Sequence, residues 1–198
     1  SYRPISLTSA LCKINERLIA NRLTWYLEKN NLININQSAY RKNRSTLDHL
    51  IRLQDSINKS INNSSFTIGL FFDFSKAFDM VWKEGLLHKL QELGINGKMK
   101  QWIQSFLSNR TFRVKINNTL SSQHILQNGT PQGSVISPLL FLVIINSFPT
   151  TEPATSTSLF ADDSAIWRSG KNLQSTITSL QKDVLKIQQW CDEWGFKL

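Results

Sequence analysis

Apolar residues recur along several stretches of the chain with the period of an α-helix. They are spaced by three and four positions and fall on one helical face, so each stretch predicts an amphipathic helix. The stretches are 11–27, 47–61, 86–93, 99–107 and 173–194. Gly94 follows the third stretch and is typical of a helix C-terminus. A further apolar helix is expected to begin near Pro138.

Other stretches are rich in β-branched and aromatic residues, which favours strands. Residues 66–74 form an aromatic run between Asn- and Ser-rich segments, and this predicts a buried strand. Residues 111–116 and 120–126 flank Asn117-Asn118 and predict a hairpin. A second hairpin is predicted over 158–168, with Asp162 and Asp163 at its tip. Because most strands do not alternate with helices in βαβ order, the fold class is α+β.

The composition is that of a folded globular chain with a surplus of positive charge. The 198 residues include 23 Lys and Arg against 14 Asp and Glu, a net charge of +9. Such a surplus indicates a polyanionic partner, most often nucleic acid. Cys12 and Cys191 are the only cysteines, which excludes a disulfide framework and favours an intracellular protein that is not secreted. The longest apolar run, 139–145, is too short to span a bilayer, so no membrane partner is expected.

Three carboxylates lie where a metal site could form. Asp73 ends the predicted strand, and Asp162 and Asp163 lie between two apolar segments. Asp is a common turn residue, and on these residues alone the turn interpretation is slightly favoured. The alternative is a shared metal site, because two carboxylates brought together repel one another unless cations neutralise them. Two Mg²⁺ ions held there could stabilise the attacking and leaving oxygens of a nucleotidyl transfer.

A Gly-rich turn lies between a predicted strand and the helix that begins near Pro138. Its sequence is GTPQGS, residues 129–134. Two glycines allow the backbone to approach a ligand closely, and Gln132 offers both a donor and an acceptor. A Gly-Pro turn before a helix is common, so this turn alone does not identify a binding site.

Five segments, taken together and in order, carry a family resemblance. They are YRPISL (2–7), QSAYRKNRST (37–46), FDFSKAFD (72–79), GTPQGS (129–134) and FADD (160–163). In this order and spacing the chain resembles the reverse transcriptase domain of non-LTR retrotransposons, the LINE-type and jockey-like elements. The resemblance covers nearly the whole chain. It departs from the family at Thr130, where Val is usual, and at Ala39-Tyr40, where Gly-Phe is frequent.

The resemblance implies a right-hand polymerase, with the chain as a single reverse transcriptase domain fragment. Residues 1 to about 65 would be fingers-like, and about 66–198 mainly palm, around a small antiparallel sheet flanked by helices. Both chain ends are expected to be cuts through a larger polypeptide, with the thumb absent. The implied activity is RNA-directed DNA polymerase, which adds a dNTP to a primer 3′-hydroxyl. Its partners would be an RNA template, a DNA primer, dNTP, and the thumb and endonuclease of the same polyprotein.

The resemblance also implies roles for individual residues. Asp73, Asp162 and Asp163 would be catalytic and, with the backbone carbonyl of Phe74, would hold two Mg²⁺ ions, for which Mn²⁺ could substitute. Phe78 would exclude a 2′-hydroxyl sterically. The residues around the incoming nucleotide would be Arg3, Ala77, Phe78 and Gln132, and those touching template or phosphate would be Arg41, Arg44 and Lys13.

Several other reactive side chains are expected to be structural. Asp79 is interpreted as a cap of the following helix. Cys191 lies on the apolar stripe of the last helix and is interpreted as a core thiol. His49, His88 and His124 have no partners at ligand spacing and are interpreted as surface or core residues.

Two other function classes stay open. The first is a catalytically inactive nucleic-acid-binding remnant of a transposon. The second is a metal nuclease built on the same carboxylates, against which Phe78 and Gln132 argue, because cleavage needs neither a sugar gate nor a nucleotide contact. The isolated fragment is expected to be weakly active or inactive, and the protein to work in the nucleus and in a cytoplasmic ribonucleoprotein.

Overall fold

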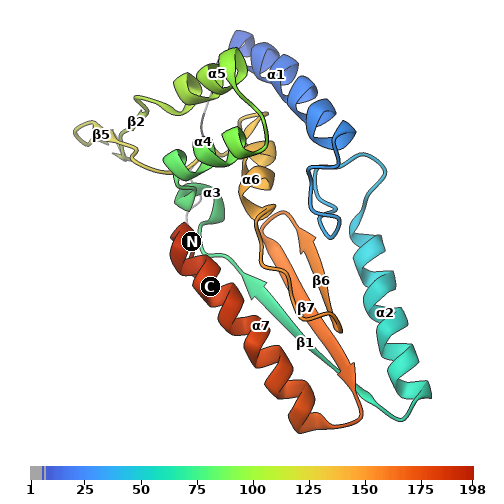
Figure 1. Ribbon diagram of the computed structural model, residues 1–198. Coiled ribbons are helices and arrows are strands. Elements are labelled where there is room, and N and C mark those ends of the chain that lie inside the picture. The colour runs from blue at the N-terminus through green and yellow to red at the C-terminus, as the bar shows by residue number, and fades with distance from the viewer. Residues whose placement is uncertain (1–5, 7) are drawn as a thin grey trace. The chain divides into compact units, whose positions relative to one another are not determined.

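The computed structural model describes residue 6 and residues 8–198 (Figure 1). Its internal contacts group the chain into two units. We call residues 1–26 with 78–144 the helical unit, and residues 27–77 with 145–198 the sheet unit. Arg3 lies outside the described residues. The expected division into fingers and palm stays a prediction.

The helical unit is built from helices and one hairpin arm. Its helices are α1 (Ala10–Lys29), α3 (Ala77–Met80), α4 (Lys83–Glu92), α5 (Gly97–Leu107) and α6 (Ser137–Ile145), of which α1, α3 and α6 extend into the sheet unit. The arm consists of β2 (Thr111–Phe112) paired with β5 (His124–Ile125), then β3 (Lys115–Ile116) paired with β4 (Thr119–Leu120). The hairpin predicted around Asn117-Asn118 is therefore confirmed, in two short pieces.

Helix α6 provides much of the core of the helical unit. Its residues Leu140, Phe141 and Ile144 are fully buried, as are Leu86 on α4 and Ile103 on α5. A helix that is apolar on every side is stable only when it is buried on every side. The apolar run that is too short for a membrane is thus a core helix. Within the described part of the chain, no helix combines the length and apolar character that a membrane span requires.

The sheet unit contains an antiparallel sheet of three strands in the order β1-β7-β6. The strands are β1 (Phe66–Asp73), β6 (Thr155–Phe160) and β7 (Asp163–Gly170), and the two long helices are α2 (Thr46–Asn62) and α7 (Leu173–Trp194). The predicted second hairpin is confirmed as β6 and β7. The register pairs Phe66 with Gly170 at one end of β1 and Asp73 with Asp163 at the other.

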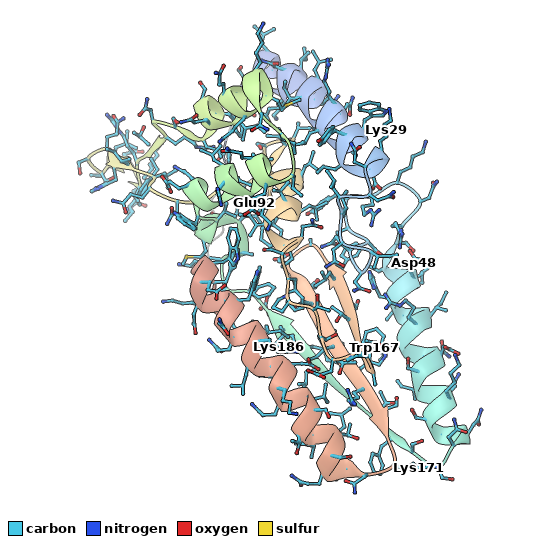
Figure 2. All side chains as sticks on the ribbon, in the orientation of Figure 1. Lys29, Asp48, Glu92, Trp167, Lys171 and Lys186 are labelled. Atoms are coloured by element: carbon cyan, nitrogen blue, oxygen red, sulfur yellow. The ribbon has the colours of Figure 1, made fainter. Side chains whose placement is uncertain are left out.

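Helices α2 and α7 cover opposite faces of this sheet (Figure 1). Trp167, labelled in Figure 2, is buried and donates its indole N–H to the Ser56 hydroxyl of α2 at 2.9 Å. On the other face, a Cβ at Gly170 would lie 2.3 Å from the Thr176 hydroxyl of α7. Successive side chains on a strand alternate between faces. The odd-numbered residues of β7, Asp163 included, therefore share the α2 face.

Two predicted burial patterns are wrong, the second of them in part. Strand β1 was expected to be buried, yet Phe71 is 74% exposed, because β1 lies at the edge of the sheet. Helix α1 was expected to bury the whole apolar stripe from Leu11 to Leu27. Its second half is buried as predicted, at Leu23 and Leu27, but Leu11 and Leu18 in the first half are 80% and 65% exposed. In the first half the helix buries Glu16 instead.

Candidate active site

The three predicted catalytic carboxylates lie together at one end of the sheet. Asp73 ends β1 and stands directly opposite Asp163, the first residue of β7. Asp162 precedes it in the β6–β7 turn and is half-buried. The pKa of Asp163 is raised above its ordinary value, first by partial burial and then by the negative charges of Asp162 and Asp73. Asp163 therefore lies close enough to both Asp162 and Asp73 to interact with their charges.

This donor set suits a hard divalent cation. Like charges directly opposite each other on a sheet are unfavourable, and a bound cation relieves that repulsion. Among the described residues, no three His, Cys, Asp or Glu side chains already form a metal-binding group. The residues present fit Mg²⁺ by the chemistry of their carboxylate oxygens and by the placement of Asp73 directly opposite Asp163.

The end of β1 is fixed by the residue after Asp73. The ring of Phe74 is buried against Trp190 and Phe196, with centroid separations of 5.9 and 5.6 Å. The backbone N–H of Ser75 donates to the carbonyl of Lys197 at 2.8 Å. Because these contacts hold the backbone on both sides of the Phe74 carbonyl, they also restrict the position of Asp73.

The β6–β7 turn is held by the segment before α2. Ser38 donates its N–H to the carbonyl of Leu159 at 3.0 Å, and Leu159 donates to the carbonyl of Asn36 at 2.9 Å. Gln37 and Leu159 form a parallel bridge. Sequence reasoning missed this contact, because nothing in the pattern of residues 34–40 marks a strand.

Tyr40 also lies beside the carboxylates. Burial, and then the negative charge of Asp162, raise the pKa of its phenol. Its backbone has a φ of 57°, in the left-handed region that non-glycine residues seldom adopt. This is the position where Gly-Phe is frequent in the family that the chain resembles. Unusual backbone conformations of this kind concentrate at functional sites.

The predicted template contacts have different surroundings. Arg41 pairs with Glu28 through two hydrogen bonds of 2.8 Å and donates to the carbonyls of Asn34 and Gln37 at 3.3 and 3.1 Å. Its guanidinium is therefore engaged in the fold. Lys13 and Arg44 are exposed. Contacts of these three residues with template or phosphate stay predictions.

In the helical unit, two of the predicted nucleotide contacts lie together. Thr130 donates its N–H to the carbonyl of Phe78 at 2.8 Å, which joins the Gly-rich turn to α3. Gln132 donates its side-chain amide to Asp79 at 2.9 Å. Gly129 has a φ of 90°, and a Cβ there would lie 2.8 Å from the Asp79 carbonyl oxygen. The turn thus requires glycine at this close approach.

The structure gives the surroundings of three residues around the Gly-rich turn and α3 to which the sequence assigned roles: Asp79, Phe78 and Ala77. Asp79 was expected to cap the next helix, but its carboxylate accepts from Gln132, and the N-cap of α4 is Trp82 without a side-chain hydrogen bond. The Phe78 ring is half-buried against Phe141, with the centroids 4.9 Å apart, so a packing role is certain and the sugar gate stays a prediction. Ala77 is buried.

The Gly-rich turn is anchored by Glu16, which sequence reasoning also missed. This side chain is fully buried on α1, and its Oε2 accepts the backbone N–H of Val135 at 2.6 Å and of Ile136 at 3.4 Å. The N–H of Ser6 donates to the carbonyl of Gln132 at 2.7 Å. Arg110 donates to the Ser6 hydroxyl at 3.1 Å. Ser6, the one residue of the YRPISL segment that the structure describes, thus contacts the Gly-rich turn.

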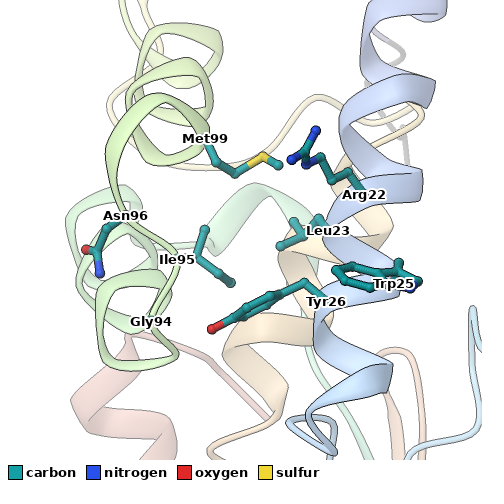
Figure 3. A pocket seen from close by; sticks show the side chains of 8 residues that line it. All are labelled: Arg22, Leu23, Trp25, Tyr26, Gly94, Ile95, Asn96 and Met99. Atoms are coloured by element: carbon teal, nitrogen blue, oxygen red, sulfur yellow. The ribbon is translucent and has the colours of Figure 1, made fainter.

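A pocket of about 230 Å³ lies elsewhere in the helical unit (Figure 3). Arg22, Tyr26 and Met99 line it together with the loop between α4 and α5. The Tyr26 hydroxyl donates to the Leu93 carbonyl at 3.1 Å. None of the predicted catalytic, nucleotide or template residues lines this pocket. The candidate site residues are therefore the carboxylates in the sheet unit and, separately, the Gly-rich turn in the helical unit.

Comparison with known proteins identifies the family. The family model "Reverse transcriptase (RNA-dependent DNA polymerase)" matches residues 1–198. The chain belongs to this family, and the resemblance seen in the sequence is confirmed.

The relatives are more specific. The chain is 34% identical to the RNA-directed DNA polymerase from mobile element jockey of Drosophila melanogaster, and the match covers all of the chain and 22% of that protein. It is 32% identical to the probable RNA-directed DNA polymerase from transposon BS of the same species, with the same coverage. The chain is thus a reverse transcriptase domain of the non-LTR retrotransposon type and spans about a fifth of these relatives.

Solved structures agree on the fold. Telomerase from Candida albicans, in complex with a fragment of telomeric RNA, superposes with a TM-score of 0.64 over 90% of this chain and 32% of that one, at 12% identity. Telomerase from Candida tropicalis, truncated from its C-terminal domain, gives 0.59 over 87% of this chain and 36% of that one, at 12% identity. At such low identity the likeness shows a shared fold, which agrees with the mixed helices and small antiparallel sheets described above.

Proposed function

We propose that this chain supplies the nucleotidyl-transfer site of an RNA-directed DNA polymerase and works within a longer polypeptide. The observation that carries the proposal is the placement of Asp73 opposite Asp163, with Asp162 in the adjoining turn. Membership of the reverse transcriptase family supports it. The substrates would be an RNA template, a DNA primer and dNTP, in the nucleus and in a cytoplasmic ribonucleoprotein.

Different residues would bind the metal ions, contact the nucleotide and exclude a 2′-hydroxyl. Asp73, Asp162, Asp163 and the carbonyl of Phe74 would hold two Mg²⁺ ions. When bound, these ions would stabilise the attacking and leaving oxygens. The primer 3′-hydroxyl would lose its proton to solvent and attack the α-phosphate; the new P–O bond would form as the bond between the α-phosphorus and the oxygen that bridges to the β-phosphate breaks, and pyrophosphate would leave. Gln132 would contact the nucleotide, and Phe78 would leave no space for a 2′-hydroxyl.

Primer extension by the polypeptide that contains this chain tests the proposal. Asp73→Asn should abolish incorporation of labelled dNTP and leave nucleic-acid binding largely intact. Asp55→Asn is a matched control, because Asp55 is an exposed aspartate of the same unit that pairs with Lys59 on α2. Undiminished extension by the Asp73 variant would refute the assignment. Nucleic-acid binding with no extension by the unaltered protein would favour the inactive remnant.

The sugar gate has its own test. Phe78→Val should admit ribonucleotides and lower the ratio of kcat/KM for dNTP over rNTP. Phe141→Leu is the control, because it alters the ring that packs on Phe78 without removing the predicted gate. If Phe78 has only a packing role, Phe78→Val should lower kcat/KM equally for dNTP and rNTP, so that their ratio stays constant. The free energy of unfolding should then fall by about 3–5 kcal/mol.

A further inference from the structure

Gln37 is a buried amide at the edge of the sheet unit. Gln37 is 1% exposed, and its backbone lies beside that of Leu159, near the end of β6. Arg41 holds this backbone by donating to the Gln37 carbonyl, and Arg41 is itself fixed by Glu28. The Gln37 side chain therefore projects from a restrained position.

One oxygen of this amide joins two segments that are far apart in the sequence. Gln37 Oε1 accepts the backbone N–H of Ala39 at 2.8 Å and that of Ala161 at 3.1 Å. Ala161 has a φ of 57°, a left-handed conformation that is unfavourable for a residue with a Cβ. Its N–H bond to Gln37 opposes relaxation of that conformation, and the next residue is Asp162.

The chemistry of the amide also matters. Gln37 Nε2 is buried and has no hydrogen-bond partner among the described residues, although burying an unpaired donor is unfavourable. A carboxylate would offer the same acceptor without the unpaired donor. It would also bury a negative charge near the half-buried Asp162, and an amide avoids that charge.

We propose that Gln37 is a positioning residue for the metal site, acting on Asp162 through the backbone of Ala161. The inference rests on the proposed function, because it assigns Asp162 to metal binding. Residues that orient metal ligands from behind change metal affinity by about 10–100-fold when altered. Loss of the Gln37 acceptor should therefore weaken cation binding, although Gln37 touches no cation.

Mn²⁺ binding to the chain, followed by the electron paramagnetic resonance of free Mn²⁺, provides the test. Gln37→Met keeps the length of the side chain and removes the acceptor, and it should weaken Mn²⁺ binding by about tenfold or more. Gln37→Glu restores an acceptor oxygen and should bind Mn²⁺ to within a few-fold of the unaltered chain. A structural role alone would not predict this rescue.

Asn146→Leu is the matched control. Asn146 also joins distant backbone groups of the sheet unit, since it accepts from the N–H of Asn34 and donates to the carbonyl of Leu32 at 2.5 Å. This variant should lose stability without losing Mn²⁺ affinity. Equal loss of affinity in the Asn146 and Gln37→Met variants, or unchanged affinity in Gln37→Met, would overturn the inference.

Asp162→Asn separates this inference from the proposed function. If Asp162→Asn leaves Mn²⁺ binding unchanged, the metal site itself is wrong. If Asp162→Asn abolishes binding while Gln37→Met retains it, the metal site stands and only the role of Gln37 is refuted.

Discussion

In each unit, one buried polar side chain anchors the backbone beside candidate site residues, and these two anchors differ in charge. Glu16 in the helical unit and Gln37 in the sheet unit each accept two backbone N–H groups through one oxygen. Glu16 binds the residues just before α6, where the positive end of a helix favours an anion. Gln37 binds the residue before Asp162, where an anion would be repelled. The local field thus explains why one anchor is charged and the other neutral.

Removing the charged anchor should have the largest effect. In Glu16→Leu the N–H groups of Val135 and Ile136 lose their acceptor. Arg110 also loses a favourable charge, since Glu16 opposes the lowering of its pKa by burial. We expect a loss of about 3 kcal/mol in the free energy of unfolding, measured with urea. A loss below about 1 kcal/mol would show that the buried carboxylate contributes little net stability.

Exchanging the charges of the two anchors tests whether the local field determines which anchor is charged. Gln37→Glu should lower the free energy of unfolding by about 2 kcal/mol at neutral pH, because it buries a negative charge beside that of Asp162. The loss should shrink on acidification, as the introduced carboxyl takes up a proton. Glu16→Gln keeps an acceptor oxygen and should cost about 1 kcal/mol. Urea titrations of both variants at neutral and acidic pH provide the measurement, and the reverse order would contradict our explanation.

The ion pair behind Gln37 should give a pH-dependent effect. The hydrogen bond from Arg41 is the main cause that lowers the pKa of Glu28. The stabilisation is therefore present above the ordinary glutamate pKa of about 4.3 and is lost as the pH falls through the lowered value. Arg41→Met should cost about 1 kcal/mol at neutral pH, since Glu28 is partly exposed, and the difference should vanish in strong acid.

Chemical denaturation over a pH series checks the effect of Arg41→Met. Lys59→Met serves as the control, because it removes only an exposed pair with Asp55 on α2 and should change stability little at any pH. If Arg41→Met lowers the free energy of unfolding by the same amount at every pH, the effect comes from lost packing and not from the ion pair with Glu28.

The smallest effect concerns a thiol beside the charged anchor. Cys12 donates to Glu16 at 3.3 Å, and burial, this bond and the charge of Glu16 raise its pKa. Glu16→Gln should therefore increase the rate of Cys12 labelling by a disulfide reagent at pH 8 a few-fold. Cys191 is the internal reference, because burial raises its pKa to about 11 and its side chain is inaccessible. An unchanged Cys12 rate would show that Glu16 does not control this thiol.

Sequence periodicity predicted most elements because their patterns are long and local. Helices α2 and α7 and the β6–β7 hairpin lie where expected. The burial errors arise because a sequence does not reveal which face its neighbours cover. On α1 the predicted stripe is correct at Leu23 and Leu27, but in the first half of the helix the buried residue is Glu16 and not Leu11. Because Glu16 is charged, the apolar pattern placed the first half of the buried stripe on the wrong face.

The carboxylates could be predicted, but their anchors could not. Asp73 and Asp163 stand at strand ends that the pattern marks, and the family motifs reinforce them. Glu16 and Gln37 act on backbone groups 119 to 124 residues away, and no local spacing encodes such contacts. Glu16 could have been recognised as an anchor, because it shares a helical face with Leu23, and a carboxylate on a buried face is unusual unless it has a hydrogen-bond partner.

The bond between Gln37 and Ala161 spans 124 residues and therefore sets an order of events during synthesis. Gln37 is synthesised long before Ala161, so its hydrogen bond to the Ala161 N–H cannot form until strands β6 and β7 have been made. Long-range contacts of this kind form late, because the closure of a large loop must precede them. The turn that carries Asp162 consequently reaches its final geometry only after β6 and β7 have been translated.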